Sequence, residues 1–221
     1  MKSYQQYCSV ARALDVVGDR WILLIVRELL AWGPSRYSDL KRGLPSIASN
    51  LLADRLKVME AEGLIERHDA PPPVGATLYQ LTERGRELQD VMRALAEWGL
   101  PRMTSGPNAE DAVQPHWTAL IGGLTLPGVL QPGAEIVLGV ESEGETMRVV
   151  LRPDGFELRR GALPAADVTI AGSAQLVGAV LSGLLTPTES ARMGLRITGR
   201  RKVLIDLVDA RVRADHDKEQ R

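Results

Sequence analysis

The stretch from Ser46 to Arg67, SIASNLLADRLKVMEAEGLIER, constrains the fold of this chain more than any other part of it. Its apolar residues recur at helical spacing, so one face of the helix would be buried and the opposite face wet. The buried stripe holds Ile47, Leu51, Leu52, Leu56 and Met59, and the wet face holds Ser49, Asn50, Ala53, Asp54 and Lys57. Gly63 suits a left-handed helix end, and the residues LIERHD that follow are typical of a short strand. Helix, glycine and strand in this order predict a recognition helix that leads into a wing.

The segments before this stretch predict further helices. Residues 9–17 form a candidate first helix, and Asp19 is a suitable N-cap for the apolar helix WILLIVRELL. That helix would end at Gly33 and Pro34, which together make a stop signal. A third helix, RYSDLKRGL, would be separated from the recognition helix by Pro45, which gives a tight helix-turn-helix join.

The segments after the recognition helix predict a hairpin and another helix. The wing would run from LIERHD through a proline-rich tip, APPPVGA, to the return strand TLYQLT. Thr82 would then cap the helix ERGRELQDVMRALAEWG, on which Val91, Leu95 and Trp98 share an apolar face.

The local charge of this region favours contact with phosphates, although the whole chain is nearly neutral. The formal net charge is −1 over 221 residues, which gives no general signal for nucleic-acid binding. Between residues 36 and 57, however, five cations minus two anions give a local charge of +3. These residues are Arg36, Lys41, Arg42, Arg55 and Lys57, with Asp39 and Asp54. The alternative is an ordinary solvated surface of mixed charge.

Residues 8–98 resemble the HxlR family of bacterial winged-helix transcriptional regulators, which are relatives of the MarR type. The matching segments are ALDVVGDRWILLIVRELL, RYSDLKRGLPSIASNLLADRLKVMEAEGLIER and YQLTERGREL, with Cys8 near the start. Ala48 departs from the family pattern, which often has serine at the start of the recognition helix. We therefore expect Ser46 or Ser49 to cap that helix instead.

The resemblance implies a homodimer on a two-fold symmetric operator in double-stranded DNA, with each recognition helix in a major groove and each wing at the flanking minor groove or backbone. It places Ser49, Asn50 and Ala53 near base edges, with Ser46 at the start of the helix. The residues expected to neutralise phosphates are Arg36, Arg42, Arg55, Lys57, Arg67 and His68. For Arg55 the alternative is a structural pair with Glu60 or Glu62.

The resemblance also suggests a dimer interface and a redox site. The interface would be formed by the helix that ends in Trp98, with Val91 and Leu95, together with the N-terminal segment; the alternative is that this helix packs on its own domain. In several members of the family an N-terminal cysteine senses oxidants or electrophiles as a thiolate, a role that Cys8 would take here. The alternative for Cys8 is a small, half-buried packing residue.

The composition changes after Trp98, where GLPRMTSGPNAEDAVQP is typical of a linker. The apolar period then becomes two, and five segments predict a largely antiparallel sheet: EIVLGVE, MRVVLR, FELRR, ADVTIAG and LRITG. The helices expected over its apolar face are HWTALIGGL, SAQLVGAVLSGLL, TPTESARMG and RRKVLIDLVDARV. We therefore expect an α+β chain with a winged helix-turn-helix domain at residues 1–100, a linker at 101–115, an α+β domain at 116–212 and a charged tail at 213–221.

The segment ADVTIAGSAQLVGAVLSGLLTPTESARMGLRITGRRKVLIDLV resembles a domain of the sterol-carrier-protein type. This resemblance implies an apolar tunnel between sheet and helices that takes a fatty or polycyclic small-molecule effector. Four small residues could leave such a space, or could merely allow close packing: Gly178, Ala179, Ser182 and Gly183. An alternative function is accordingly a carrier of apolar ligands whose winged helix serves for dimerisation.

Several functional classes find no support in the sequence. The histidines His68, His116 and His216 lie far apart, and no G-x-S-x-G motif, P-loop or paired-cysteine spacing occurs, so we expect no catalysis, cofactor or metal. A single cysteine and an N-terminus without an apolar signal core predict a reducing cytoplasm. Arg27 and Glu28 interrupt the longest apolar run, so we expect no membrane span.

Overall fold

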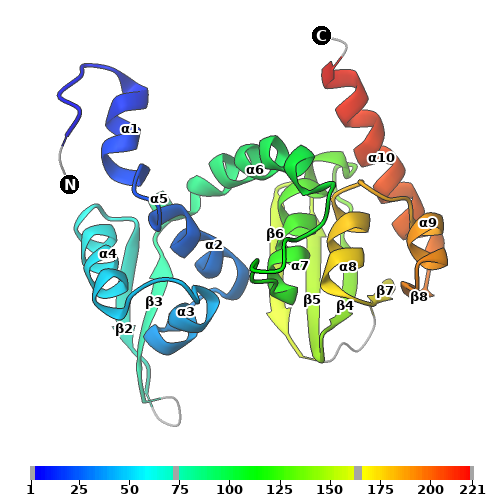
Figure 1. Cartoon of the computed structure of the whole chain (residues 1–221), viewed down its shortest axis with the longest axis horizontal. Coiled ribbons are helices and arrows are strands. Elements are labelled where there is room, and N and C mark those ends of the chain that lie inside the picture. Colours follow the sequence, from blue (N-terminus) through cyan, green and yellow to red (C-terminus); the bar gives the residue numbers. More distant parts are fainter. Residues whose placement is uncertain (1–2, 72–74, 162–165, 220–221) are drawn as a thin grey trace. The chain divides into compact units, whose positions relative to one another are not determined.

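The computed structural model describes residues 3–71, 75–161 and 166–219, and within them the chain forms two compact units, residues 1–92 and 93–221 (Figure 1). The division between the units falls inside a long helix, α6 (Leu88–Gly99), rather than in a loop. Both units combine helices with a sheet, so the expected α+β class is confirmed.

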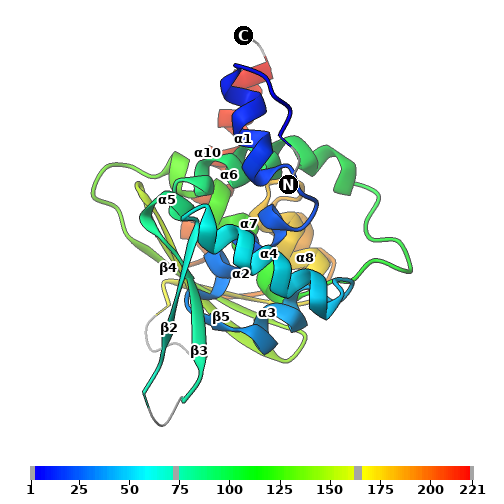
Figure 2. The same ribbon diagram turned by 90° about the vertical axis from the view of Figure 1, so that its left-hand side faces the viewer.

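The first unit is a winged helix-turn-helix domain. Its helices are α1 (Ser9–Val17), α2 (Ile22–Trp32), α3 (Tyr37–Gly43), α4 (Ser49–Ala61) and α5 (Glu83–Arg86). Its antiparallel sheet has the order β1-β3-β2, from β1 (Ser35–Arg36), β2 (Ile65–Asp69) and β3 (Thr77–Leu81). The hairpin of β2 and β3 extends beyond the helices of this unit as a wing (Figure 2). Part of the predicted tip, residues 72–74, lies outside the described residues.

The core of this unit is organised around α2 and the apolar face of α4. Leu52, Leu56 and Met59 of α4 are buried, as their spacing predicted. In α2 the buried set includes Glu28, a residue that is only 1% exposed. Its carboxylate pairs with the Arg27 guanidinium at 2.9 Å, so the charge is compensated inside the core.

The helix ends correct two predictions and confirm a third. The N-cap of α2 is Trp21 rather than Asp19, whose Oδ1 instead accepts a hydrogen bond from the Trp21 N–H at 3.0 Å. The N-cap of α4 is Ala48, which has no side-chain acceptor, so neither Ser46 nor Ser49 caps this helix. Thr82 caps α5 as predicted, because its Oγ1 accepts from the Gly85 N–H at 3.0 Å. The single long helix expected after Thr82 is divided into α5 and α6.

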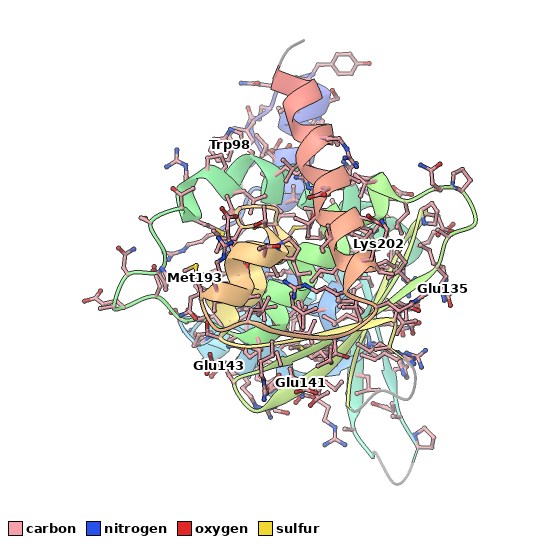
Figure 3. The ribbon with its side chains drawn as sticks, turned by 90° about the vertical axis from the view of Figure 1, so that its right-hand side faces the viewer. Trp98, Glu135, Glu141, Glu143, Met193 and Lys202 are labelled. Carbon is pink, nitrogen blue, oxygen red and sulfur yellow. The ribbon has the colours of Figure 1, made fainter. Side chains whose placement is uncertain are left out.

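The second unit places helices on one side of a mainly antiparallel sheet. In the described residues, the sheet has the order β6-β5-β4-β7-β8, and only β4 and β7 pair in parallel. The strands are β4 (Ile136–Ser142), β5 (Glu145–Arg152), β6 (Gly155–Arg160), β7 (Val168–Ala171) and β8 (Arg196–Gly199). The helices are η1 (Leu100–Met103), α7 (Pro115–Thr125), η2 (Pro127–Val129), α8 (Ala174–Leu181), α9 (Pro187–Arg192) and α10 (Arg201–Glu219). Figure 3 shows the helices over the sheet, with Glu141 on the far side.

The order of β7, α8, α9, β8 and α10 along the chain agrees with the predicted pattern of strand, helix, short helix, strand and final helix. The charged tail expected at residues 213–221 is not a separate segment, because α10 continues through it as far as Glu219. The apolar stripe that predicted this last helix ends earlier than the helix does. The last part of α10 is therefore helical without an apolar pattern that would have predicted it.

The helices of the second unit pack closely on one another and on the sheet. A Cβ atom added at Gly123 of α7 would lie 2.6 Å from the Phe156 ring of β6, and one at Gly178 of α8 would lie 3.3 Å from Thr118 of α7. Gly178 is thus closely packed on α7, but it also lines a cavity together with Ala179 and Ser182, two more of the four small residues considered from sequence. This cavity of about 650 Å³ lies against the segment 100–114, α7, α8 and Met193, and no strand residue lines it. Its position therefore differs from the tunnel between sheet and helices that we expected.

Candidate nucleic-acid interface

The exposed face of α4 carries the residues predicted to read bases. Ser49, Asn50 and Lys57 are exposed, and Ala53 is half-buried on the same side of the helix. Within the described parts of the chain, the side chains of Asn50 and Lys57 make no hydrogen bond or ion pair. Ser46 is exposed in the turn before the helix. The face is therefore free to meet another molecule, whereas the opposite face holds the helix to its core.

Two side chains of α3 fix the turn that leads into α4. The Tyr37 hydroxyl donates a hydrogen bond to the backbone carbonyl of Ser49 at 2.6 Å. The Lys41 ammonium donates to the backbone carbonyl of Ile47, also at 2.6 Å. Lys41 was counted in the basic region predicted from sequence, but its charge serves this turn. Sequence reasoning missed both contacts, because neither residue type nor spacing indicates a side chain that reaches into the next loop.

The remaining cations of the predicted site lie around this face. Arg42 pairs with Asp39 at 3.4 Å on α3, and Arg67 of β2 pairs with Glu60 of α4 at 3.1 Å. Both pairs are largely exposed, and such pairs contribute about 0–1 kcal/mol. Their cations can therefore exchange a carboxylate for a phosphate at small cost. Two more predicted residues are exposed here: Arg36 and His68.

Arg55 differs from the other cations because it points to its own unit. Its Nη2 lies 2.8 Å from Asp19 Oδ2, and the side chains of Arg55 and Asp19 are 22% and 17% exposed. The structural partner is thus Asp19 and not Glu60 or Glu62, the partners that we considered from sequence. Burial alone would raise the pKa of Asp19, but hydrogen bonds from Arg55 and the Trp21 N–H, with the charge of Arg55, hold that pKa below its ordinary value.

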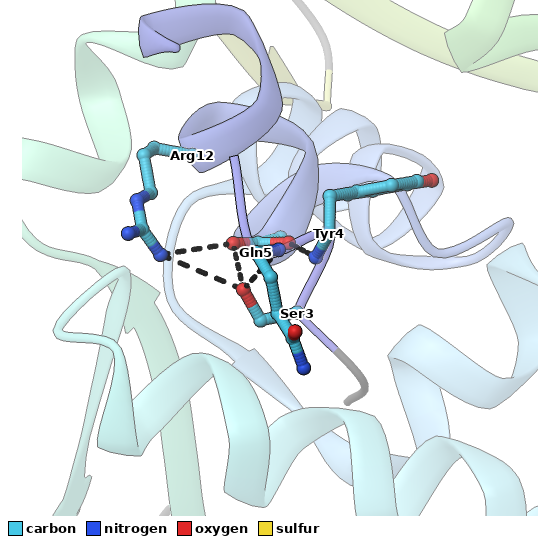
Figure 4. Close-up of polar contacts among 5 residues, drawn as sticks. Ser3, Tyr4, Gln5 and Arg12 are labelled. Atoms are coloured by element: carbon cyan, nitrogen blue, oxygen red, sulfur yellow. Dashed lines mark hydrogen bonds and ion pairs between the residues drawn. The ribbon is translucent and has the colours of Figure 1, made fainter. Parts of the chain in front are cut away.

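The N-terminal segment is tied to α1 by a small polar cluster (Figure 4). Asp15 accepts hydrogen bonds from the Tyr4 N–H at 2.7 Å and the Ser3 hydroxyl at 2.8 Å, and Arg12 lies 3.6 Å away. The Tyr4 N–H contributes most to holding the pKa of Asp15 below its ordinary value. Cys8 is the N-cap of α1 and is exposed, so the alternative of a half-buried packing residue is wrong.

The face of α6 predicted as a dimer surface is not covered by the described residues of this chain. Val91 and Leu95 are exposed, and Trp98 is 71% exposed, with the Arg102 guanidinium 5.3 Å from its ring centre. The alternative, that these side chains pack on their own domain, is therefore wrong for this chain. On α1, Val10 and Leu14 are also exposed at helical spacing.

The described residues give no support for metal or membrane chemistry. No group of three His, Cys, Asp or Glu side chains among them could hold a metal ion. His116 is buried beside the Trp117 ring, His68 lies in the wing, and the side chain of His216 lies outside the description. No helix in the described ranges is both long and apolar enough to cross a bilayer.

Comparison with known proteins identifies the family. The HxlR-like helix-turn-helix profile matches residues 16–105. The HTH-type transcriptional regulator YvaP of Bacillus subtilis is 33% identical over 87 residues, which are 39% of this chain and 80% of that protein. The regulator YodB of the same organism is 35% identical over 86 residues, 39% of this chain and 76% of YodB. The solved structure of reduced YodB matches 46% of this chain and 100% of its own, with 31% identity and a TM-score of 0.39. The sequence matches to YvaP and YodB show that the chain belongs to the HxlR-like helix-turn-helix family, and both relatives are HTH-type transcriptional regulators.

Proposed function

We propose that this protein is a homodimeric transcriptional regulator that binds a two-fold symmetric operator in double-stranded DNA. The observation that carries the proposal is the polar face of α4, where Asn50 and Lys57 are exposed and unused by the described chain. A buried apolar face holds the same helix rigidly in its unit. A helix mounted in this way fits a major groove, and the β2-β3 wing fits the adjacent backbone.

The residues divide into base-reading and phosphate-binding groups. Asn50 has the amide geometry that bonds adenine in two places, and Ala53 can contact a thymine methyl group. Ser49 reaches base edges or the sugar-phosphate backbone from the same helix turn. The cations proposed for phosphates are Arg36, Arg42, Lys57, Arg67 and His68. Because Arg55 is paired with Asp19, we assign it a supporting role.

The exposed apolar residues of α1 and α6 support the dimer. Val91, Leu95 and Trp98 follow the spacing of one helix face, as do Val10 and Leu14. Large apolar side chains exposed along a helix face often mark an interface in soluble proteins. We expect the Leu95→Glu variant to sediment as a monomer at concentrations where the wild type is a dimer, while Glu87→Ala, on an exposed residue before α6, leaves the dimer intact. A dimeric Leu95→Glu variant would contradict this surface.

Two finer proposals concern what the regulator senses. The cavity of the second unit favours a small-molecule effector, and it also fits the alternative of a ligand carrier that uses the winged helix for dimerisation. The exposure of Cys8 favours a second candidate, regulation by thiol oxidation. The thiol mechanism predicts that diamide abolishes DNA binding by the wild type, whereas the Cys8→Ser variant still binds DNA after the same treatment. Equal loss in both would refute it.

The test of DNA binding is fluorescence anisotropy of the purified protein on DNA from upstream of its own gene, against a scrambled duplex, over a range of salt concentrations. Lys57→Ala and Arg42→Ala should each reduce the slope of log K against log salt by about 1. The matched control is Arg196→Ala, which removes an exposed cation from β8 of the second unit. An unchanged slope in the first two variants would refute their assignment to phosphates.

Base reading has a different signature. Asn50→Ala should weaken binding to the operator by about 1–3 kcal/mol and leave binding to the scrambled duplex nearly unchanged, because phosphate contacts dominate the latter. Equal weakening on both duplexes would contradict a base-reading role for Asn50. If the upstream DNA proves not to contain the operator, selection from a random duplex pool supplies the specific sequence for the same comparison.

A further inference from the structure

The cavity of the second unit has one wall made by the segment that follows α6. This wall comprises η1 and the chain as far as Gln114, and the facing wall comprises α7, α8 and the chain to Met193. The loop of this segment passes beside α8 and α9, near Met193, in Figure 3. Every residue from 101 to 113 is exposed. This wall is thus a surface loop that lies against the packed helices α7 and α8, and such a loop can adjust to a molecule bound between it and the helices.

The lining is apolar around a floor of small residues. Large apolar side chains come from both walls, among them Met103, Val113, Trp117, Ile121, Leu176 and Met193. The floor is the part of α8 where the small residues Gly178, Ala179 and Ser182 line the cavity. Met103 and Met193 are 50% and 61% exposed, so apolar surface faces water here. A volume of about 650 Å³ lies within the range of sites that bind drug-sized molecules.

The two charged residues of the lining, Asp111 and Arg102, differ in how far other groups of the chain satisfy their charge. Asp111 accepts hydrogen bonds from the backbone N–H and the side-chain amide of Asn108, at 2.7 and 3.0 Å. Arg102 stacks over Trp98 and makes no ion pair with any residue in the described parts of the chain. The carboxylate is therefore partly satisfied by local bonds, whereas the guanidinium remains without an anion. The lining of this apolar cavity thus includes an exposed cation that no anion of the described residues compensates.

We infer that this cavity binds an apolar molecule with one anionic head, such as a medium-chain or aromatic carboxylate. The head pairs with Arg102, and the apolar body lies between Trp117 and the small residues of α8. The inference deepens the proposed function by naming the effector class and its site, and it rests on that function only for its regulatory meaning. Because η1 follows α6 directly, an occupant of the cavity contacts the chain immediately behind the proposed dimer helix. The occupant can change the equilibrium between two arrangements of the dimer only by the difference in its binding free energy for the two.

Isothermal titration calorimetry of the full chain with decanoate and with decan-1-ol tests the site and the head group separately. We expect saturable binding of one decanoate per chain, about fivefold tighter than decan-1-ol, which is the size of an exposed ion pair. Arg102→Gln should abolish this fivefold preference and leave the affinity for decan-1-ol unchanged. Arg196→Gln, which removes a cation outside the cavity, should leave both affinities unchanged.

A second pair of variants tests the location. Ala179→Phe fills the floor of the cavity and should abolish binding of both compounds. Ala109→Phe adds the same ring to the exposed loop at a residue outside the lining, and should bind like the wild type. Circular dichroism of each variant confirms that the chain is folded before titration.

Three results would overturn the inference. These are no saturable binding of either compound, undiminished binding by Ala179→Phe, and equal affinity for the acid and the alcohol that Arg102→Gln leaves unchanged. The calorimetry contains no DNA, so failure of the proposed function would appear separately, as loss of specific anisotropy on the operator. If the chain binds decanoate but no DNA, the inference about the cavity stands and the proposed function as a transcriptional regulator is refuted.

Discussion

The Asp19–Arg55 pair gives the sharpest test of how the recognition helix is held. Asp19 precedes α2, Arg55 lies in the middle of α4, and their charged atoms are 2.8 Å apart. The substitution Asp19→Asn removes the charge but keeps an oxygen that can accept from the Trp21 N–H. What it changes is therefore the ion pair alone, and the guanidinium is left mostly buried without its anion.

The expected loss follows from the burial of the pair. Exposed pairs contribute about 0–1 kcal/mol, and breaking a fully buried pair costs about 3–5 kcal/mol. With about one fifth of each side chain exposed, this pair lies between the two cases. We therefore expect Asp19→Asn to lower the free energy of unfolding of the first unit by about 2 kcal/mol. Arg55→Gln should cost a similar amount, because Asp19 is then left without its cation.

A double-mutant cycle measured by urea denaturation separates the pair from its surroundings. The double variant Asp19→Asn/Arg55→Gln should lose less than the sum of the single variants, with a coupling energy of about 1–2 kcal/mol. Arg55→Gln should also leave the salt slope of DNA binding nearly unchanged. A coupling below about 0.5 kcal/mol, together with a slope reduced by about 1, would refute the pair and return Arg55 to the phosphates.

The same pair predicts a pH dependence. The pKa of Asp19 is below its ordinary value of 3.8 in the folded chain, so folding favours its charged form. The stabilisation is fully present above the unfolded pKa and is lost as the pH falls through the folded pKa. Between pH 5 and pH 2, the stability difference between the wild type and Asp19→Asn should therefore shrink. A difference that stays constant over this range would contradict the ion pair.

Three further substitutions test other contacts, each by chemical denaturation of the full chain. Gly43→Ala should lower the free energy of unfolding by about 1–3 kcal/mol, because the added Cβ would overlap the buried Glu28 carboxylate. This loss is expected although alanine is a better helix former than glycine. A stabilised variant would show that the Glu28 side chain can move. Thr82→Ala should cost about 1 kcal/mol through loss of the cap, and Thr82→Ser much less; equal losses would exclude the cap as the cause. Arg211→Ala should cost about 3 kcal/mol, because Arg211 is 2% exposed and pairs with Glu97; a loss below 1 kcal/mol would mean that water replaces it.

The parts of the fold that sequence predicted are those with a repeating hydrophobic signal. The stripe of α4 predicted its buried face, because a 3.6-residue period sustained over 13 residues leaves few alternatives. The period of two in β4 and β5 predicted the sheet for the same reason, since Leu138, Val140, Met147 and Val149 all lie buried in register. A pattern repeated over many residues predicts a helix or strand even though no single residue of it is specific for either.

What sequence could not predict depends on single contacts between distant residues. The partner of Arg55 is 36 positions away, and nearby acidic residues such as Glu60 look equally suitable along the chain. β1 has two residues, too few for any period, and it exists because Ser35 and Arg36 pair with β3. The cavity lies against a loop whose proline- and glycine-rich composition indicated only a linker. In each case the deciding partner is set by the fold rather than by local pattern.

The way in which α4 is held limits how an effector could act. Three contacts tie this helix and the turn before it to their own unit: Tyr37 to the Ser49 carbonyl and Arg55 to Asp19 in the helix, and Lys41 to the Ile47 carbonyl in the turn. With the buried apolar face added, moving α4 within its unit would break several contacts at once. A ligand bound next to η1, which follows α6, therefore needs less free energy to change the spacing of the two recognition helices in the dimer than to move α4 within its own unit. If decanoate changes the affinity for DNA, crosslinking α3 to α4 should leave that change intact, and its abolition by the crosslink would show that α4 itself moves.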